Sequence, residues 1–201
     1  MITDLKNKII IISSPSGAGK TTLCKLLLKK INNLTLSISY TSRNKRVNET
    51  DGKDYYFVTN KKFIKLKKNN FFIETAKNFN NYYGSPYNNI LKASKIKKNI
   101  LFDIDWKGAR KIRKNFKQSN IIDFFILPPS ISELKKRLIK RGRENNNEIK
   151  LRLSYAIDEM MHYSDYKYIL INQNIKETTN DIIKIINYNL LKEKNNKILN
   201  K

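Results

Sequence analysis

The chain has 201 residues, of which 40% are hydrophobic, so it is long enough and apolar enough to fold around a full-sized core. One cysteine excludes an internal disulfide, no apolar run approaches the roughly 20 residues that span a membrane, and the start MITDLKNK lacks a secretory-signal pattern. We therefore expect a cytoplasmic protein with no membrane association. The formal net charge of +24 is typical of nucleic-acid binders. However, the lysines are spread along the whole chain among many asparagines and isoleucines, and we hypothesise that a genomic base bias produces most of the charge. We expect no specific nucleic-acid partner.

A phosphate-binding loop is the first motif in chain order. Residues 8–13 (KIIIIS) predict a buried strand and residues 21–31 an amphipathic helix. Between them, SSPSGAGKTT matches the pattern G-x-x-x-x-G-K-[ST] except that Ser14 replaces the first glycine. Because that position mainly opens the turn, Ser14 can serve if its backbone angles are ordinary. Such a loop aims backbone N–H groups at phosphate oxygens, while Lys20 reaches the outer phosphates and Thr21 offers a hydroxyl to Mg²⁺.

The loop predicts a nucleoside triphosphate site, and it does not name the base. The predicted contacts are Ser14, Pro15, Ser16, Gly17, Ala18, Gly19, Lys20, Thr21 and Thr22.

Strands and helices alternate along most of the remaining chain. Strands are predicted at 34–39, 55–59, 71–76, 99–104, 121–127 and 167–171. Helices are predicted near 60–69, 87–97, 106–116, 130–142, 146–163 and 175–193. The alternation implies an α/β fold with a mainly parallel sheet covered by helices on both faces. Ser130 and Glu133 predict a capping box at one helix start. Residues 34–86 break the rhythm and predict an inserted lobe, and residues 193–201 predict a frayed tail.

Four stretches together resemble the guanylate kinase family. They are SYTSRNKRVNETDGKDYYF (39–57), FIETAKNFNNYYGSP (72–86), ILFDIDWKGA (100–109) and PPSISELKKRLIKRG (128–142). The resemblance runs from residue 9 to about residue 190. It implies a P-loop NTPase three-layer fold with a central parallel sheet, formed by residues 1–33, 87–127 and 160–192. It also implies a GMP-binding lobe at 34–86 and a small lid at about 137–152.

The resemblance implies an ATP:GMP phosphotransferase that makes GDP and ADP, accepts dGMP as well, and works with Mg²⁺. The implied contacts to the GMP phosphate are Arg43, Arg46, Tyr55 and Tyr83. The implied contacts to guanine are Ser39, Glu74 and Ser85, with Asp103 and Asp105 nearby, where they meet GMP or waters of Mg²⁺. The implied lid residues over the ATP phosphates are Arg137, Arg141 and Arg152, and Asn172 is implied near adenine. The implied catalytic groups are Lys20, Arg43, Arg137, Arg141 and Arg152.

The chemistry of these residue types fits the implied roles. Guanidinium forks such as those of Arg43 and Arg46 suit phosphate oxygens, although two arginines on a loop are more often a solvated surface. Guanine offers two parallel donors that match the two oxygens of Glu74, whereas adenine has an acceptor at the same edge. Taken alone, Glu74 favours a salt bridge with one of the many lysines. Arg137 and Arg141 share a helix face, which is usually solvent-facing.

Some residues depart from the family pattern. The stretch NQN at 172–174 lacks two acids that are usual there, Ser42 replaces a threonine, and Lys107 stands where glutamine is common. Three alternatives stay open. A kinase for AMP or dTMP conflicts with Glu74, a non-catalytic protein-binding relative conflicts with Lys20 and Thr21, and a nucleic-acid binder is favoured by charge alone. The sequence does not indicate an oligomeric state.

Overall fold

The computed structural model describes residues 7–142 and 145–199. The chain forms an α/β fold whose central five-stranded sheet has the strand order β2-β7-β1-β8-β9. The chain forms two compact units. One consists of Met1–Ile11 and Asn33–Ile121, and the other consists of Ile12–Asn32 and Ile122–Lys201. The boundary falls within β1 (Ile9–Ser13), a fully buried strand of β-branched residues as predicted.

The first unit carries two strands of the central sheet. β2 (Leu34–Leu36) pairs in parallel with β7 (Asn99–Asp103), whose apolar residues are buried, as expected for a parallel strand covered on both faces. The helices of this part are α3 (Tyr87–Lys95), α4 (Trp106–Asn115) and the short 3₁₀ helix η1 (Gln118–Asn120). β7 ends at Asp103 and α4 starts at Trp106, so Asp103 and Asp105 lie at a strand-to-helix turn.

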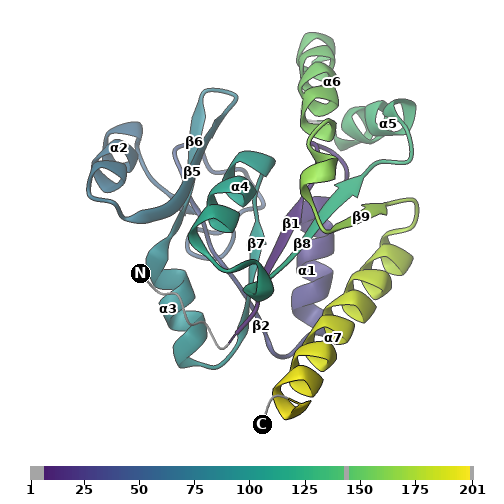
Figure 1. Ribbon diagram of the computed structural model, residues 1–201. Helices are drawn as coiled ribbons and strands as arrows, with labels where there is room; N and C mark the ends of the chain where they lie inside the picture. Colours follow the sequence, from purple (N-terminus) through teal and green to yellow (C-terminus); the bar gives the residue numbers. More distant parts are fainter. Residues whose placement is uncertain (1–6, 143–144, 200–201) are drawn as a thin grey trace. The chain divides into compact units, whose positions relative to one another are not determined.

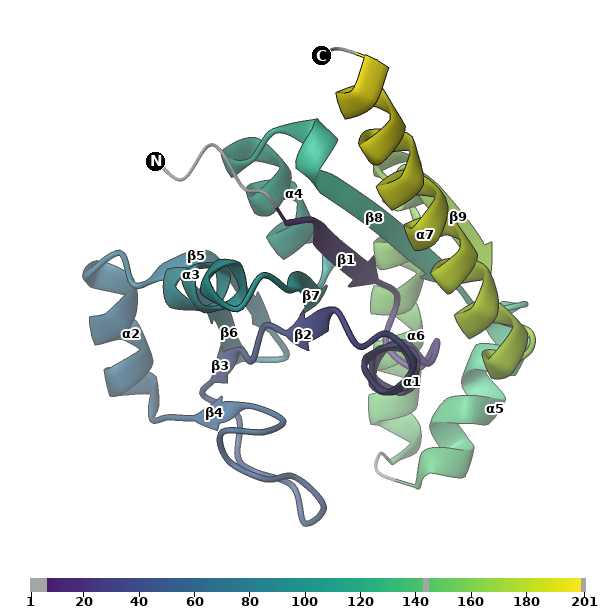
Figure 2. The ribbon, with the colours of Figure 1, turned by 90° about the horizontal axis from the view of Figure 1, so that it is seen from below.

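The same unit holds a separate four-stranded sheet with the order β4-β3-β6-β5 (Figure 2). Its elements are β3 (Tyr40–Thr41), β4 (Tyr56–Phe57), α2 (Asn60–Lys68), β5 (Phe72–Asn78) and β6 (Asn81–Pro86). The ring of Phe63 stacks on Phe72 at 4.6 Å and on Tyr82 at 5.3 Å, and this pins α2 to the sheet. A long loop joins β3 to β4. The break in rhythm at 34–86 thus reflects a second sheet.

Two strands of this sheet differ from the prediction. The predicted strand 34–39 is shorter than expected, because β2 ends at Leu36, and the sequence did not predict β3, which begins at Tyr40 in the other sheet. The sequence did not predict β6, since its glycine and proline obscure the strand pattern. The turn between β5 and β6 consists of Phe79 (φ 47°) and Asn80 (φ 62°), two left-handed residues that close a tight hairpin.

The second unit is built around α1 (Lys20–Lys30), β8 (Ile121–Leu127) and β9 (Tyr168–Ile171), and β8 pairs in parallel with β9. Its other elements are α5 (Ile131–Arg141), α6 (Asn146–Met160), η2 (Tyr163–Asp165) and α7 (Ile175–Leu199). The long helix α7 packs against α1 (Figure 1). Helices α5 and α6 meet through the buried side chains of Leu134, Leu138 and Ala156.

The ends of two helices differ from the prediction. At α5, the Ser130 hydroxyl accepts from the Glu133 N–H as predicted, but the Glu133 carboxylate pairs with Arg137. The complete capping box is at α6, between Asn145 and Glu148. Helix α7 continues to Leu199, past the predicted end near 193, and residues 200–201 lie outside the described part. Of the helices that the structure describes, none has the length and apolar character needed to cross a membrane.

Candidate functional site

The phosphate-binding loop lies between β1 and α1, in the predicted strand–loop–helix order. Gly17 (φ 96°) and Gly19 (φ 100°) are both left-handed, a conformation that side chains rarely adopt. A Cβ on Gly17 would stand 3.0 Å from Leu134 and from Leu138, so α5 packs directly on the loop. Ser14 does not have a positive φ, and its hydroxyl donates to the Pro15 carbonyl at 3.1 Å. The first position of the motif therefore needs no glycine here.

Helix α1 begins at Lys20, so the residues expected at the phosphates occupy its first turn. Gly19 is the N-cap and offers no side-chain cap, and no acidic residue occupies the first turn. The N–H groups of Lys20, Thr21 and Thr22 therefore meet no carboxylate or hydroxyl cap from this first turn. The start of a helix and its dipole favour anions, and the phosphate contacts expected of these residues stay a prediction.

Asn172 is a buried link between the loop and α5. Its Nδ2 donates to the Ala18 carbonyl at 2.8 Å, and its backbone carbonyl accepts from the Arg137 guanidinium at 3.0 Å. A Cβ on Gly19 would lie 2.6 Å from that Nδ2, so Asn172 also requires the glycine. Its Oδ1 is buried and has no hydrogen-bond partner in the structure. The predicted adenine contact of Asn172 stays a prediction, and the neighbouring Asn174 accepts from backbone N–H groups at the start of α7.

Two side chains of α6 bind Ser16, one at its hydroxyl group and one at its backbone N–H. The Arg152 guanidinium donates to the Ser16 hydroxyl at 3.1 Å, and the Ser16 N–H donates to the Glu159 carboxylate at 3.2 Å. Arg152 and Glu159 are two helical turns apart and so share a face. Arg137 and Arg152, which the sequence alone would favour as solvent-facing, thus contact the loop or the residue after β9. The Arg141 side chain lies outside the described part of the structure.

The three side chains predicted to meet guanine form one hydrogen-bonded chain in the first unit. Ser85 Oγ donates to Glu74 Oε1 at 2.7 Å, and Ser39 Oγ lies 3.0 Å from Ser85 Oγ. All three residues are buried. Glu74 and Ser85 are register partners on β5 and β6, and Ser39 directly precedes β3. The second sheet therefore assembles a group that is scattered in the sequence.

Burial raises the pKa of Glu74 to about 7, and the charge of Asp105 adds to this, against the hydrogen bond from Ser85 and the charge of Lys111. The carboxyl group rests on α4, because a Cβ on Gly108 would stand 2.8 Å from Glu74 Oε2. The salt bridge with a lysine that the sequence alone would favour is not what holds this side chain. Its oxygens are positioned by Ser85 and by the space above Gly108.

Asp105 has a structural task that the sequence did not reveal. Its Oδ1 accepts from the Gly108 N–H at 2.8 Å as the N-cap of α4, and its Oδ2 accepts from the Asn78 amide at 2.7 Å. Both carboxylate oxygens are thus engaged by neighbouring elements. The sequence treated Asp105 together with Asp103, which is the last residue of β7.

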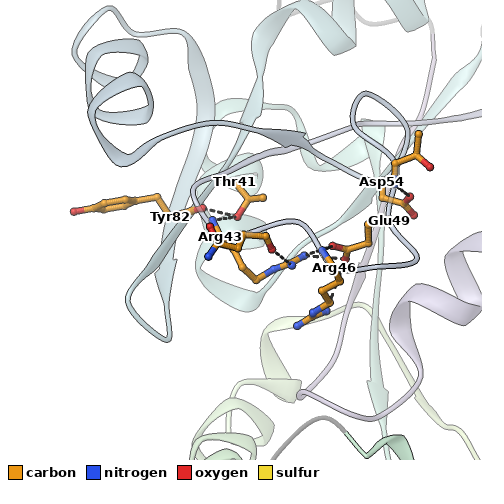
Figure 3. Close-up of polar contacts among 8 residues, drawn as sticks. Thr41, Arg43, Arg46, Glu49, Asp54 and Tyr82 are labelled. Carbon is orange, nitrogen blue, oxygen red and sulfur yellow. Dashed lines mark hydrogen bonds and ion pairs between the residues drawn. The ribbon is translucent and has the colours of Figure 1, made fainter.

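The four side chains predicted at the GMP phosphate are linked by a series of contacts. The Arg43 guanidinium lies 5.6 Å from the centre of the Tyr55 ring, and the Tyr55 ring meets the Tyr83 ring at 6.1 Å. Arg43 is joined to Arg46 through Glu49, as Figure 3 shows. Burial lowers the pKa of Arg43, but the hydrogen bond and charge of Glu49 outweigh it and hold that pKa above its usual value.

Sequence reasoning missed four residues of these sites. Glu49 lies six positions after Arg43 and three positions after Arg46. Its opposite charge could therefore have indicated an ion pair with them. Gly108 and Asn78 are conspicuous only once β5 and α4 are known to touch. Glu159 is 143 positions from Ser16, and nothing local to it indicates the contact.

We compared the chain with known protein families and with known proteins. The family model for guanylate kinase matches residues 6–189. A guanylate kinase of Rickettsia prowazekii is 48% identical over 183 residues, covering 90% of this chain and 92% of that protein. A guanylate kinase of Rickettsia felis is 47% identical over 184 residues, with 90% and 95% coverage.

The fold of the chain is also similar to that of a solved structure. The crystal structure of guanylate kinase from Anaplasma phagocytophilum superposes with a TM-score of 0.76 at 33% identity, covering 94% of this chain and 88% of that one. The chain belongs to the guanylate kinase family.

Proposed function

We propose that this guanylate kinase transfers the γ-phosphoryl group of ATP to GMP with the loop at 14–22 as the ATP site and the sheet β4-β3-β6-β5 with its loop as the GMP site. The observation that carries the proposal is the chain Glu74–Ser85–Ser39, since it presents a buried carboxylate beside two hydroxyls. An ionised Glu74 accepts from two parallel N–H donors, which guanine has and adenine lacks. The assignment to GMP therefore rests on chemistry as well as on family membership.

On the ATP side, backbone N–H groups of the loop and the Lys20 ammonium bind the phosphates. Arg137 and Arg152, which contact Asn172 and Ser16, neutralise charge as the phosphoryl group moves, and Arg141 is assigned with them. We assign Asn172 to adenine, and its buried Oδ1, which has no hydrogen-bond partner, supports this assignment as an acceptor. A GMP phosphate oxygen attacks the γ-phosphorus in line and the bond to the β-γ bridging oxygen breaks, so no covalent enzyme intermediate is needed.

Mg²⁺ is the cofactor that the family implies, and the donor set fits it. Magnesium is usually held by one or two protein groups together with substrate phosphates and waters. Within the described residues no cluster of three or more His, Cys, Asp or Glu could hold a metal alone. We assign Thr21 to the ion, with water-mediated help from Asp103 or Asp105. When bound, Mg²⁺ neutralises charge on the ATP phosphates.

We further propose that the lobe at 34–86 and the lid at about 137–152 close over bound nucleotides and exclude water from the phosphoryl group. Hydrogen exchange with and without a bisubstrate analogue tests the closure, and unchanged protection in both segments would contradict it. The high positive charge is assigned no nucleic-acid role, and the cytoplasm is the compartment that we propose. Any affinity for DNA should fade at physiological salt.

A coupled assay tests the function. The purified protein is given ATP and Mg²⁺ with GMP, dGMP, AMP, CMP, UMP or dTMP in turn. We expect turnover with GMP, a lesser or equal turnover with dGMP, and poor turnover with the other four. Equal rates for AMP and GMP would remove the guanine assignment and leave only the kinase fold.

A further inference from the structure

We propose that Glu49 is a positioning residue for the phosphate of GMP, because its carboxylate holds the guanidinium of Arg43 and the backbone of Arg46. The inference rests on the proposed function, in which these two arginines bind that phosphate. The three residues lie in the loop between β3 and β4, and Figure 3 shows the contacts of Glu49 with both arginines.

The contact with Arg43 is short and largely shielded from water. Arg43 Nη2 donates to both carboxylate oxygens of Glu49, at 2.8 and 3.0 Å. The two side chains are only 13% and 15% exposed, so the pair is worth more than an ordinary surface ion pair. Arg43 Nη1 donates to the Asn44 carbonyl at 2.6 Å, and the guanidinium faces the rings of Tyr55 and Phe57. The Arg43 fork is therefore fixed in one orientation before any ligand binds.

The contact with Arg46 anchors Glu49 itself. The Arg46 N–H donates to Glu49 Oε2 at 2.9 Å, and the Glu49 N–H donates to the Arg46 carbonyl at 3.1 Å. The backbone bond closes a turn, and the carboxylate cannot leave without breaking its own bond to the Arg46 N–H. The Arg46 Nη1 lies 3.8 Å from Glu49 Oε1, and its side chain is 40% exposed, which leaves it accessible to a ligand. Glu49 thus stays in place when a phosphate arrives.

The charges of these three residues also support a positioning role for Glu49. Burial raises the pKa of Glu49, but the hydrogen bonds and charges of Arg43 and Arg46 outweigh it and hold the pKa below its usual value, so the group stays ionised. Without this anion, two guanidinium groups on one loop would repel each other and spread apart. With it, the cluster keeps one net positive charge and a defined geometry to offer a dianionic phosphate.

An opposite reading of the same contacts makes a different prediction. If Glu49 only occupied the arginines until GMP displaced it, removal of its charge would tighten GMP binding. If it positions them, removal of its charge weakens GMP binding. The sign of the change in GMP affinity therefore decides between the two.

The experiment compares Glu49→Gln, Glu49→Asp and Asp54→Asn in the full chain. Misplacement of a binding group by about 1 Å can cost about a hundredfold, so we expect the KM for GMP to rise about tenfold to a hundredfold in Glu49→Gln. The KM for ATP should change less than about twofold. The inhibition constant of guanosine, which has no phosphate, should also stay the same. Glu49→Asp keeps the charge on a shorter side chain and should recover part of the affinity.

Asp54→Asn is the matched control. Asp54 lies in the same loop and accepts from the Thr50 N–H at 2.9 Å, a bond that asparagine can also accept. This variant loses one negative charge from the loop, and its KM for GMP should change less than about twofold. A KM for GMP in Glu49→Gln that is unchanged or lower than that of the parent, in a protein with normal ATP kinetics, would overturn the inference.

Arg43→Ala separates this inference from the proposed function. If Arg43→Ala raises the KM for GMP and Glu49→Gln does not, the phosphate site stands and only the role of Glu49 is wrong. If neither substitution changes the KM for GMP, the placement of the GMP phosphate at these arginines is wrong, and the inference falls with it.

Discussion

The loop after β1 and the sheet β4-β3-β6-β5 are both assigned to phosphate-bearing ligands, but they are built in different ways. The loop offers backbone N–H groups from one continuous stretch of residues and contains two left-handed glycines, and Asn172, Arg152 and Glu159 support it from elsewhere in the chain. The second sheet offers side chains from β5, β6, the residue before β3 and the loop between β3 and β4. The groups of a backbone site are contiguous in the sequence, whereas those of a side-chain site are scattered and depend on supporting residues such as Glu49 and Gly108.

The largest expected effect tests the side-chain region through base selection. Glu74→Gln replaces an acceptor with a donor that opposes a guanine N–H. A site built to bind one edge can reject a mismatched partner by ~10⁴-fold, and part of that discrimination should be lost. We expect kcat/KM for GMP to fall by about a thousandfold or more, while the KM for ATP stays nearly constant. Steady-state kinetics with each nucleotide varied checks this, and unaltered GMP kinetics would contradict the guanine assignment.

The next effect tests the loop. Lys20→Ala removes the only side-chain charge that the loop itself supplies, and loss of a preorganised group of this kind costs about 3 kcal/mol, or more than a hundredfold in turnover. Lys25→Ala, an exposed position on the same helix, is the control and should keep near-normal turnover. Circular dichroism should show both variants folded. Near-normal turnover in folded Lys20→Ala would remove the assignment of this loop.

A smaller effect is expected when a residue that supports the guanine site is changed and the ligand-binding groups are kept. In Gly108→Ala the new Cβ would stand 2.8 Å from Glu74 Oε2, so the carboxylate must move. We expect the KM for GMP to rise about tenfold and the KM for ATP to stay within about twofold. If both KM values rise together, α4 has been displaced as a whole and the effect is not confined to Glu74.

The last prediction concerns stability and not rate. The folded-state pKa of Glu74 is about 7, above its ordinary value of 4.5, so the folded protein binds this proton more tightly than the unfolded chain does. The resulting stabilisation is complete below about pH 4.5 and is lost as the pH rises through 7. Relative to Glu74→Gln, the parent protein without nucleotide should lose about 2–3 kcal/mol of stability between pH 5 and pH 8. Denaturant unfolding of both proteins at the two pH values measures this, and parallel pH profiles would contradict it.

Much of the fold could be predicted because its signals are local. The strands β1 and β8 are mainly apolar, and the loop that follows β1 is a contiguous motif, so all three were predicted. The strand β6 was missed because its identity depends on pairing with β5 and on a turn at Phe79 and Asn80, where neither residue is the glycine that such turns favour.

For the site residues, too, local signals could be predicted and contacts that depend on packing could not. Arg43, Glu74 and Ser85 lie in stretches that resemble one family, and the structure brings Glu74 and Ser85 together. The capping role of Asp105 depends on the exact start of α4, a boundary that sequence patterns fix poorly. The bond between Glu159 and Ser16 depends on how α6 packs, which no local pattern encodes.

The buried carboxyl group of Glu74 has a consequence for calorimetry. Near pH 6 most ligand-free molecules hold a proton on this group, whereas a guanine edge with two donors favours the ionised form. Binding of the base then expels a proton into the buffer, close to one at pH 6 and close to none at pH 9. The heat of guanosine binding should accordingly depend on the ionisation enthalpy of the buffer at the lower pH and become independent of it at the higher one. Guanosine is the informative ligand, because the phosphate of GMP titrates near the same pH and would add its own protons to the balance.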